Sequence, residues 1–165
     1  MSRVVDIQTV SIAVASASVM VGVFYYILQL RHQSKVRQTD ILLRIYSAFG
    51  SEGFQKARTK AFNMEFKDYN EFVKKYLMSP TGFGDTPENY GLTTVCVFYE
   101  GIGVLLQRKL IDLGLVEDLF GYDAVHLWER IKPAVEGWRK QFQAPRSMQQ
   151  FEFLYNELKK REQKS

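Results

Sequence analysis

The stretch from Ile7 to Leu30 decides the fold and reads IQTVSIAVASASVMVGVFYYILQL. It contains no charged side chain in 24 residues. As an α-helix it would extend about 36 Å, which is enough to cross a hydrocarbon core of about 30 Å. We therefore interpret it as a single transmembrane helix. Residues 1–31 would form a membrane anchor, and residues 32–165 a cytosolic helical domain, with the anchor helix running on into that domain.

Two other interpretations of this stretch are a cleaved signal peptide and a buried core helix. Ala15-Ser16-Ala17 is similar to a cleavage site, but the longest apolar run, residues 19–28, comes after it rather than before it. A core helix is disfavoured because a domain of this size rarely buries an uncharged helix of this length. An uncleaved anchor therefore accounts best for the pattern.

The charges that flank the span predict its orientation. Arg3 and Asp6 cancel on the N-terminal side, whereas several basic residues follow the span. Because cytoplasmic loops carry an excess of Lys and Arg, we expect the N-terminus outside the cell membrane and the remaining chain in the cytoplasm. Anionic headgroups attract a nearby basic side chain by about 1 kcal/mol. The candidates for headgroup contact are Arg31, Lys35 and Arg37, although an ordinary solvated surface would carry the same residues.

Composition limits the rest of the chain to one domain in a reducing compartment. The residues after the span suffice for one core but not for two. The only cysteine, Cys96, excludes an intramolecular disulfide and agrees with a cytoplasmic location. The net charge of +4 is small, and no compact basic stripe interleaved with aromatic residues occurs. We therefore expect no nucleic-acid partner.

Apolar periodicity and capping residues predict an all-α domain. The first helix should continue to Phe49, where Gly50 ends it and Ser51 begins the next. The further expected elements are helices at 52–64, 69–78, 87–110 and 123–143, a short helical segment at 116–120, a loop at 79–85, and a last helix that opens with a capping box at 147–150. Asp68 and Thr86 are the expected N-caps, and Pro133 should kink or divide its helix.

The helix around Gly91 to Gln107 is hydrophobic nearly all round, as the central helix of a bundle would be. A second membrane span is the alternative, and it would place Glu100 near the bilayer centre at a cost of about 2.5–3.5 kcal/mol. We favour the core helix. Glu100 is then a buried structural acid that needs a partner. An arginine at 108, 130 or 139 could form an ion pair with it, or it could tether a neighbouring backbone.

Several motifs of low specificity are distributed along most of the chain. They are Gln29 and Gln33 after the span, Phe98-Tyr99-Glu100-Gly101-Ile102-Gly103, Leu110-Ile111-Asp112, Trp128 with Trp138-Arg139, and Phe151-Glu152-Phe153. In this combination the chain resembles the small prokaryotic membrane-anchored proteins grouped as a domain of unknown function. The resemblance implies an N-terminal membrane helix and a helical cytosolic domain. It implies no activity, cofactor or site residues.

No combination of residues indicates catalysis, a cofactor or a metal. Asp123, His126 and Arg130 share a helical face, but one D-x-x-H motif lacks the further ligands that a metal site needs. The glycine-rich stretch 82–85 lacks the Lys and Ser/Thr of a phosphate-binding loop. Cys96 has apolar neighbours, as an inert core thiol does. We therefore expect no enzyme activity, and we identify no small-molecule substrate.

One face of the predicted span is small or polar. Its residues recur at spacings of three and four: Gln8, Ser11, Ala15, Ser18, Gly22, Tyr25 and Gln29. Small residues let helices approach closely in lipid, and a lone span has no intramolecular partner. We expect this face to associate with a second copy or with another membrane protein. A homo-oligomeric pore lined by the same face is the alternative, and small residues scattered by chance along an anchor would also produce the pattern.

Overall fold

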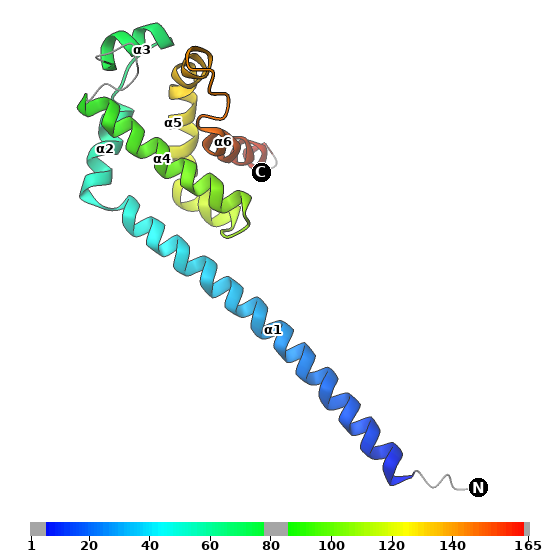
Figure 1. Ribbon diagram of the computed structural model, residues 1–165. Coiled ribbons are helices and arrows are strands. Elements are labelled where there is room, and N and C mark those ends of the chain that lie inside the picture. Colours follow the sequence, from blue (N-terminus) through cyan, green and yellow to red (C-terminus); the bar gives the residue numbers. More distant parts are fainter. Residues whose placement is uncertain (1–5, 78–85, 164–165) are drawn as a thin grey trace. The chain divides into compact units, whose positions relative to one another are not determined.

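The computed structural model describes residues 6–77 and 86–163, and helices are the only regular secondary structure in those ranges. They are α1 (Ile7–Phe49), α2 (Glu52–Phe62), α3 (Tyr69–Tyr76), α4 (Pro87–Gln107), α5 (Leu113–Gln141) and α6 (Gln149–Glu162) (Figure 1). The predicted all-α class is confirmed. The predicted loop at 79–85 and the end of the third predicted helix at 78 lie outside the described residues. The chain divides into two compact units, residues 1–40 and 41–165.

The first unit contains the apolar part of α1. Every residue from Asp6 to Arg37 is exposed, although most of the stretch is hydrophobic. In the described part of the chain, α1 and α4 are the two helices long and apolar enough to cross a membrane. None of the most apolar window of α1 is buried, against 39% of that of α4. The predicted end of the anchor at residue 31 concerns the edge of the lipid rather than protein packing, and it stays a prediction.

The second unit is a bundle in which α4 is the central helix. It packs against α2 and α6, while α5 contacts α3 and α6. The largest fully buried side chains come from α4, α5, α6 and the segment after α2, and include Tyr99, Phe120, Trp128 and Phe151. The last turns of α1 belong to this unit, where the ring of Phe49 lies 5.2 Å from that of Phe120. The predicted central position of α4 is therefore confirmed.

Side-chain oxygens cap the starts of α2, α3, α4 and α5, and Asp6 Oδ1 accepts a longer hydrogen bond of 3.4 Å from the N–H of Gln8 at the start of α1. These oxygens accept hydrogen bonds from backbone N–H groups that have no partner inside the helix. The pairs are Ser51 with Phe54 at 3.3 Å, Asp68 with Glu71 at 2.8 Å, Thr86 with Asn89 at 3.2 Å and Asp112 with Gly114 at 2.8 Å. Of the N-caps predicted from the sequence, Ser51, Asp68 and Thr86 are confirmed.

The predicted division of α5 is wrong. The short segment at 116–120 and the helix at 123–143 are one helix, Leu113–Gln141, and Pro133 lies inside it without dividing it. Gly121 is buried within the helix, where an added Cβ would meet the side chain of Leu158 from α6 at 3.8 Å. This glycine is therefore packed inside a continuous helix and does not mark a break. Burial of successive turns of α5 outweighs the low helix propensity of Gly121 and Pro133.

The predicted capping box of the last helix is also wrong. Met148, not Ser147, is the N-cap residue of α6, and its backbone is left-handed, with φ of 54°. Its side chain makes no capping hydrogen bond. The acceptor for the N–H of Phe151 at this helix start comes instead from Glu100 of α4.

A matched pair of glycines in α4 tests the packing of α6. A Cβ at Gly103 would collide with the carbonyl oxygen of Gln150, whereas one at Gly101 would have no neighbour within 4 Å. We expect Gly103→Ala to lower the free energy of unfolding by about 1–3 kcal/mol through overpacking. Gly101→Ala should raise it by about 0.5–1 kcal/mol because alanine favours the helix. Denaturant unfolding followed by tryptophan fluorescence measures both, and equal effects would contradict the close approach.

Candidate functional site

The predicted association face lies on α1, and all seven of its residues are exposed: Gln8, Ser11, Ala15, Ser18, Gly22, Tyr25 and Gln29. Two of its hydroxyls have partners within the same helix. Ser11 Oγ donates to the carbonyl of Ile7, and Ser18 Oγ to that of Val14, each at 2.9 Å. An added Cβ at Gly22 would have no neighbour within 4 Å. The face is therefore a shallow surface whose serine hydroxyls are already satisfied.

The basic residues that follow this face are exposed as well. Arg31, Lys35 and Arg37 lie on the continuation of α1 towards the second unit. Thr39 Oγ1 donates to the carbonyl of Lys35 at 3.1 Å, again within the helix. These side chains are thus accessible to an external anionic group.

Glu100 connects α4 to the start of α6. Its side chain is half-buried, and its Oε2 accepts a hydrogen bond from the backbone N–H of Phe151 at 2.7 Å. This N–H belongs to the first turn of α6, where a negative charge also interacts favourably with the helix dipole. Glu100 therefore does what the Ser147 side chain was predicted to do, and it does so from another helix.

The arginines considered for Glu100 serve other groups. Arg139 pairs with Glu152, with Nη2 and Oε2 2.8 Å apart, and its Nε donates to the carbonyl of Ser147 at 2.9 Å. Arg130 donates to the carbonyls of Phe62 and Met64 at the end of α2. Arg108 is the C-cap residue of α4. Of the two kinds of partner considered from the sequence, Glu100 thus has the neighbouring backbone, through the N–H of Phe151.

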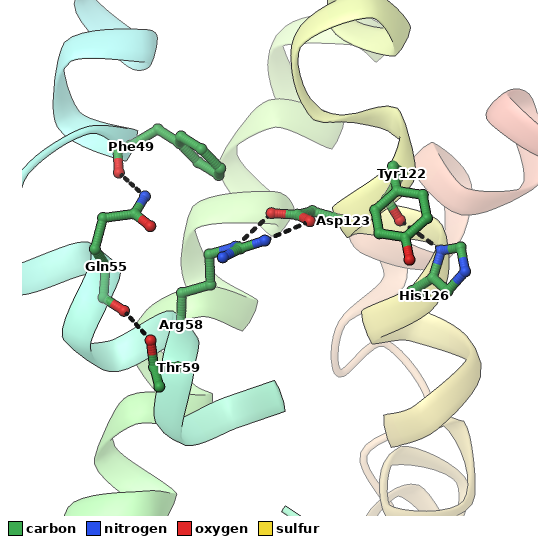
Figure 2. A network of polar contacts seen from close by, with 7 residues as sticks. All are labelled: Phe49, Gln55, Arg58, Thr59, Tyr122, Asp123 and His126. Atoms are coloured by element: carbon green, nitrogen blue, oxygen red, sulfur yellow. Dashed lines mark hydrogen bonds and ion pairs between the residues drawn. The ribbon is translucent and has the colours of Figure 1, made fainter. Parts of the chain in front are cut away.

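A bidentate ion pair joins α2 to α5 inside the second unit (Figure 2). Arg58 Nε lies 2.5 Å from Asp123 Oδ2, and Arg58 Nη2 lies 2.7 Å from Asp123 Oδ1. Asp123 is only 8% exposed, and it is the one buried charged residue in the described part of the chain. The hydrogen bond to Asp123, more than any other effect, raises the pKa of Arg58. The guanidinium also lies 5.1 Å from the ring centre of Phe62.

Three residues share one face of α5 but contact different groups: Asp123, His126 and Arg130. Asp123 faces Arg58, while His126 Nδ1 lies 2.8 Å from the carbonyl of Tyr122 (Figure 2). Across residues 6–77 and 86–163, no group of three His, Cys, Asp or Glu side chains could hold a metal ion. Within those ranges Asp123 and His126 contact different groups and do not converge on one point.

Two other buried groups of α4 stay neutral. Burial, with a smaller contribution from Glu100, raises the pKa of the Cys96 thiol to about 12. Burial also raises the pKa of the Tyr99 hydroxyl well above its ordinary value, and the charge of Asp123 adds to this effect. A thiol that holds its proton this strongly is a poor nucleophile. Cys96 therefore behaves chemically as a small apolar side chain.

A cavity of about 400 Å³ lies between α3, α4 and α5. Seven buried apolar residues line it: Phe72, Leu77, Leu92, Cys96, Ile131, Ala134 and Val135. Its rim carries Asn89, Tyr90, Thr93, Trp138, Ser147 and Met148. The volume falls in the range of about 300–1,000 Å³ that is typical of small-molecule pockets. The sequence analysis missed this site, because its lining comes from helices that are distant along the chain.

Arg58 was missed for the same reason. It stands 65 positions before Asp123, and in the sequence it looks like an exposed residue of an amphipathic helix. An acid among the apolar positions of α5 signals that a partner is needed, but it does not indicate which cation supplies it.

Comparison with family models gives one match, to a domain of unknown function called DUF4760, over residues 12–158. The chain belongs to the DUF4760 family. The matched range includes residues 12–40 of the first unit and residues 41–158 of the second. Searches of curated proteins and of solved structures found no match.

The buried ion pair of this DUF4760 chain yields a stability prediction. Asp123→Ala leaves the Arg58 guanidinium without its acceptor, and we expect a loss of about 3 kcal/mol in the free energy of unfolding. The double variant Arg58→Met with Asp123→Leu should recover most of that loss, because both charges are then removed. Chemical unfolding measures each variant. As a control, Lys56→Ala breaks an exposed pair with Glu52 and should change stability by no more than about 0.5 kcal/mol.

Because the Cys96 thiol is buried, we expect the stability of the fold to decrease at alkaline pH. The pKa of this thiol is about 12 in the folded chain and about 8.5 when unfolded. As the pH rises above about 8.5, the unfolded chain loses a proton that the folded chain keeps, so stability falls. Between pH 7 and 9.5 the native chain should lose about 1.4 kcal/mol more than Cys96→Ala does. Equal losses in the two chains would contradict the buried neutral thiol.

Proposed function

We propose that this protein is a single-pass membrane protein whose cytosolic helical domain serves as an interaction and assembly module, and that copies associate through the small and polar face of α1. In this proposal the chain has no enzymatic activity of its own. Its partners are the lipid bilayer and a second copy of the chain.

The observation that carries the proposal is the exposure of an uncharged apolar helix. The 24 residues from Ile7 to Leu30 carry no charge, and none of them is buried. A helix of this length that is apolar and exposed on all sides offers far more apolar surface than the patches of a few hundred Å² that soluble proteins leave in water. A bilayer would cover it, and the helix would satisfy its own backbone hydrogen bonds there.

The hydroxyls of the association face support a dry helix contact over a pore. Ser11 and Ser18 donate to carbonyls of their own helix, so their O–H groups require no donor–acceptor partner outside it. Ala15 and Gly22 place almost no side-chain volume between two helices, so the backbones can approach closely. Such a face suits close packing against an identical helix better than it suits lining a water-filled channel.

The exposed basic residues support the proposed orientation. Arg31, Lys35 and Arg37 follow the span directly, whereas Arg3 and Asp6 cancel before it. The excess of positive charge favours a cytoplasmic location for the bundle. Contact of these side chains with anionic headgroups would hold the end of the span at the inner leaflet.

The first test is the mass of the full-length protein in lipid nanodiscs. We expect a defined oligomer for the native chain and a shift towards the monomer for Ala15→Leu and Gly22→Leu, because the larger side chains separate the helix backbones. Ala13→Leu makes the same change on the opposite side of α1 and should leave the mass unchanged. A monomeric native chain would contradict self-association, and equal effects at residues 13 and 15 would contradict this face.

Single cysteines separate the dry contact from the pore. Cys96 is buried and its pKa is raised, so it contributes little background reaction with thiol reagents. In the oligomer, Ser18→Cys should react slowly with a water-soluble maleimide. Fast reaction at residue 18 from the aqueous phase would overturn the dry contact in favour of a lumen.

A further inference from the structure

We propose that the pocket between α3, α4 and α5 binds the acyl chain of a fatty acid or of a membrane lipid. The pocket itself is a feature of the second unit alone. That a membrane supplies the ligand rests on the proposed function.

The floor of the pocket selects for an apolar ligand. Its buried residues come from three helices and from the residue after α3, and they offer no charged group. Cys96, the only one of them with an ionisable side chain, is held in its neutral form by burial. Water in an apolar pocket has few hydrogen-bond partners. A hydrocarbon chain that displaces this water therefore breaks few hydrogen bonds.

The rim suits a ligand whose polar end stays in water. Tyr90 and Thr93 are exposed and mark the side on which the pocket opens to solvent. No Asp, Glu, Lys or Arg occurs among the described residues that line the pocket. A carboxylate or phosphate would therefore gain no ion pair inside, whereas an acyl chain can enter and leave its headgroup outside.

Two rim side chains, Met148 and Trp138, offer apolar contact to a flexible chain. Met148 is unbranched and polarizable, which lets it fill irregular space around a ligand. Trp138 presents a large apolar surface and lies 4.3 Å from Phe142, measured between ring centres. A long, flexible hydrocarbon fits this lining better than a rigid polar molecule, which would leave hydrogen-bonding groups unpaired.

The chain offers a matched pair of positions for the test. Thr93 lines the pocket, whereas the next residue, Thr94, does not, and its Oγ1 donates to the carbonyl of Tyr90 at 2.9 Å. Thr93→Trp places a ring at the mouth, and Thr94→Trp makes the same change beside it. Ala134→Leu fills the floor by a smaller amount, and it provides a second variant with less change at the surface.

The experiment is photo-crosslinking of the full-length protein in nanodiscs with palmitic acid that carries a diazirine, followed by peptide mapping. We expect labelled peptides from α4 and α5 around Cys96 and Ala134, and competition of that label by unmodified palmitic acid. Thr93→Trp and Ala134→Leu should each reduce the pocket label by about tenfold, the change that 1.4 kcal/mol of binding free energy produces. Thr94→Trp should leave it unchanged.

A pocket label that is absent, that unmodified palmitic acid does not displace, or that Thr93→Trp and Thr94→Trp reduce equally would overturn the proposal. A parallel reaction with a diazirine-bearing phosphatidylcholine in the nanodisc identifies the source. Labelling by the free acid alone supports a fatty acid as the ligand, and labelling by the phospholipid supports a membrane lipid.

The same maps separate this inference from the proposed function. Label on α1 from the phospholipid reports insertion of the span into lipid, and the variants in the pocket should not change it. Label on α1 without label in the pocket overturns only the acyl-chain site. Label in the pocket without label on α1 overturns only the membrane anchor.

Discussion

The start of α6 on the surface of α4 is the contact on which the bundle depends. Met148 gives this helix no side-chain cap, so its first turn relies on the carboxylate of Glu100, 2.7 Å from the N–H of Phe151. Gly103, one turn further along α4, leaves room for the carbonyl of Gln150. Electrostatic capping and close backbone approach therefore fix the same few residues of α6 from two points.

The aromatic core follows from that anchoring. With Phe151 held at its backbone, its ring stacks 5.0 Å from Tyr99 and meets Trp128 edge-on at 5.1 Å. These three rings connect α4, α5 and α6 and are all fully buried. The ion pair between Arg58 and Asp123 adds a directional constraint between α2 and α5. Desolvation offsets most of the attraction in a buried pair of this kind, so its net contribution to stability is small even though removing one partner is costly.

The sequence predicted what depends on local chemistry and missed what depends on distant partners. Periodicity and N-caps such as Thr86 located the helices, because both act within a few residues. The interruption expected near Gly121 was wrong, because burial against α6 outweighs the local preference of glycine. The donor to Glu100 lies 51 positions away, and Arg58 lies 65 positions from Asp123. For Glu100 the sequence indicated that a buried acid needs a partner, whereas Asp123 was considered only as part of a D-x-x-H motif. In both cases only the fold determines which partner is near. The association of the small face of α1 stays a prediction, because it rests on the spacing of residues that are all exposed.

The contrast between the two most apolar helices supports placing the single proposed span in α1. Both are long enough and apolar enough to cross a bilayer, yet their polar groups have different requirements. In α1 the hydroxyls of Ser11 and Ser18 bond to their own helix, and nothing in the stretch from Ile7 to Leu30 carries a charge. In α4, Glu100 has its partner in α6, and the small surface at Gly103 is already occupied by the backbone of Gln150. Moving α4 into lipid would break that contact and leave a carboxylate without a donor, whereas moving α1 into lipid breaks no hydrogen bond of its serines. Glu100 and Gly103 thus connect α4 to α6, whereas the apolar stretch of α1 from Ile7 to Leu30 is exposed throughout.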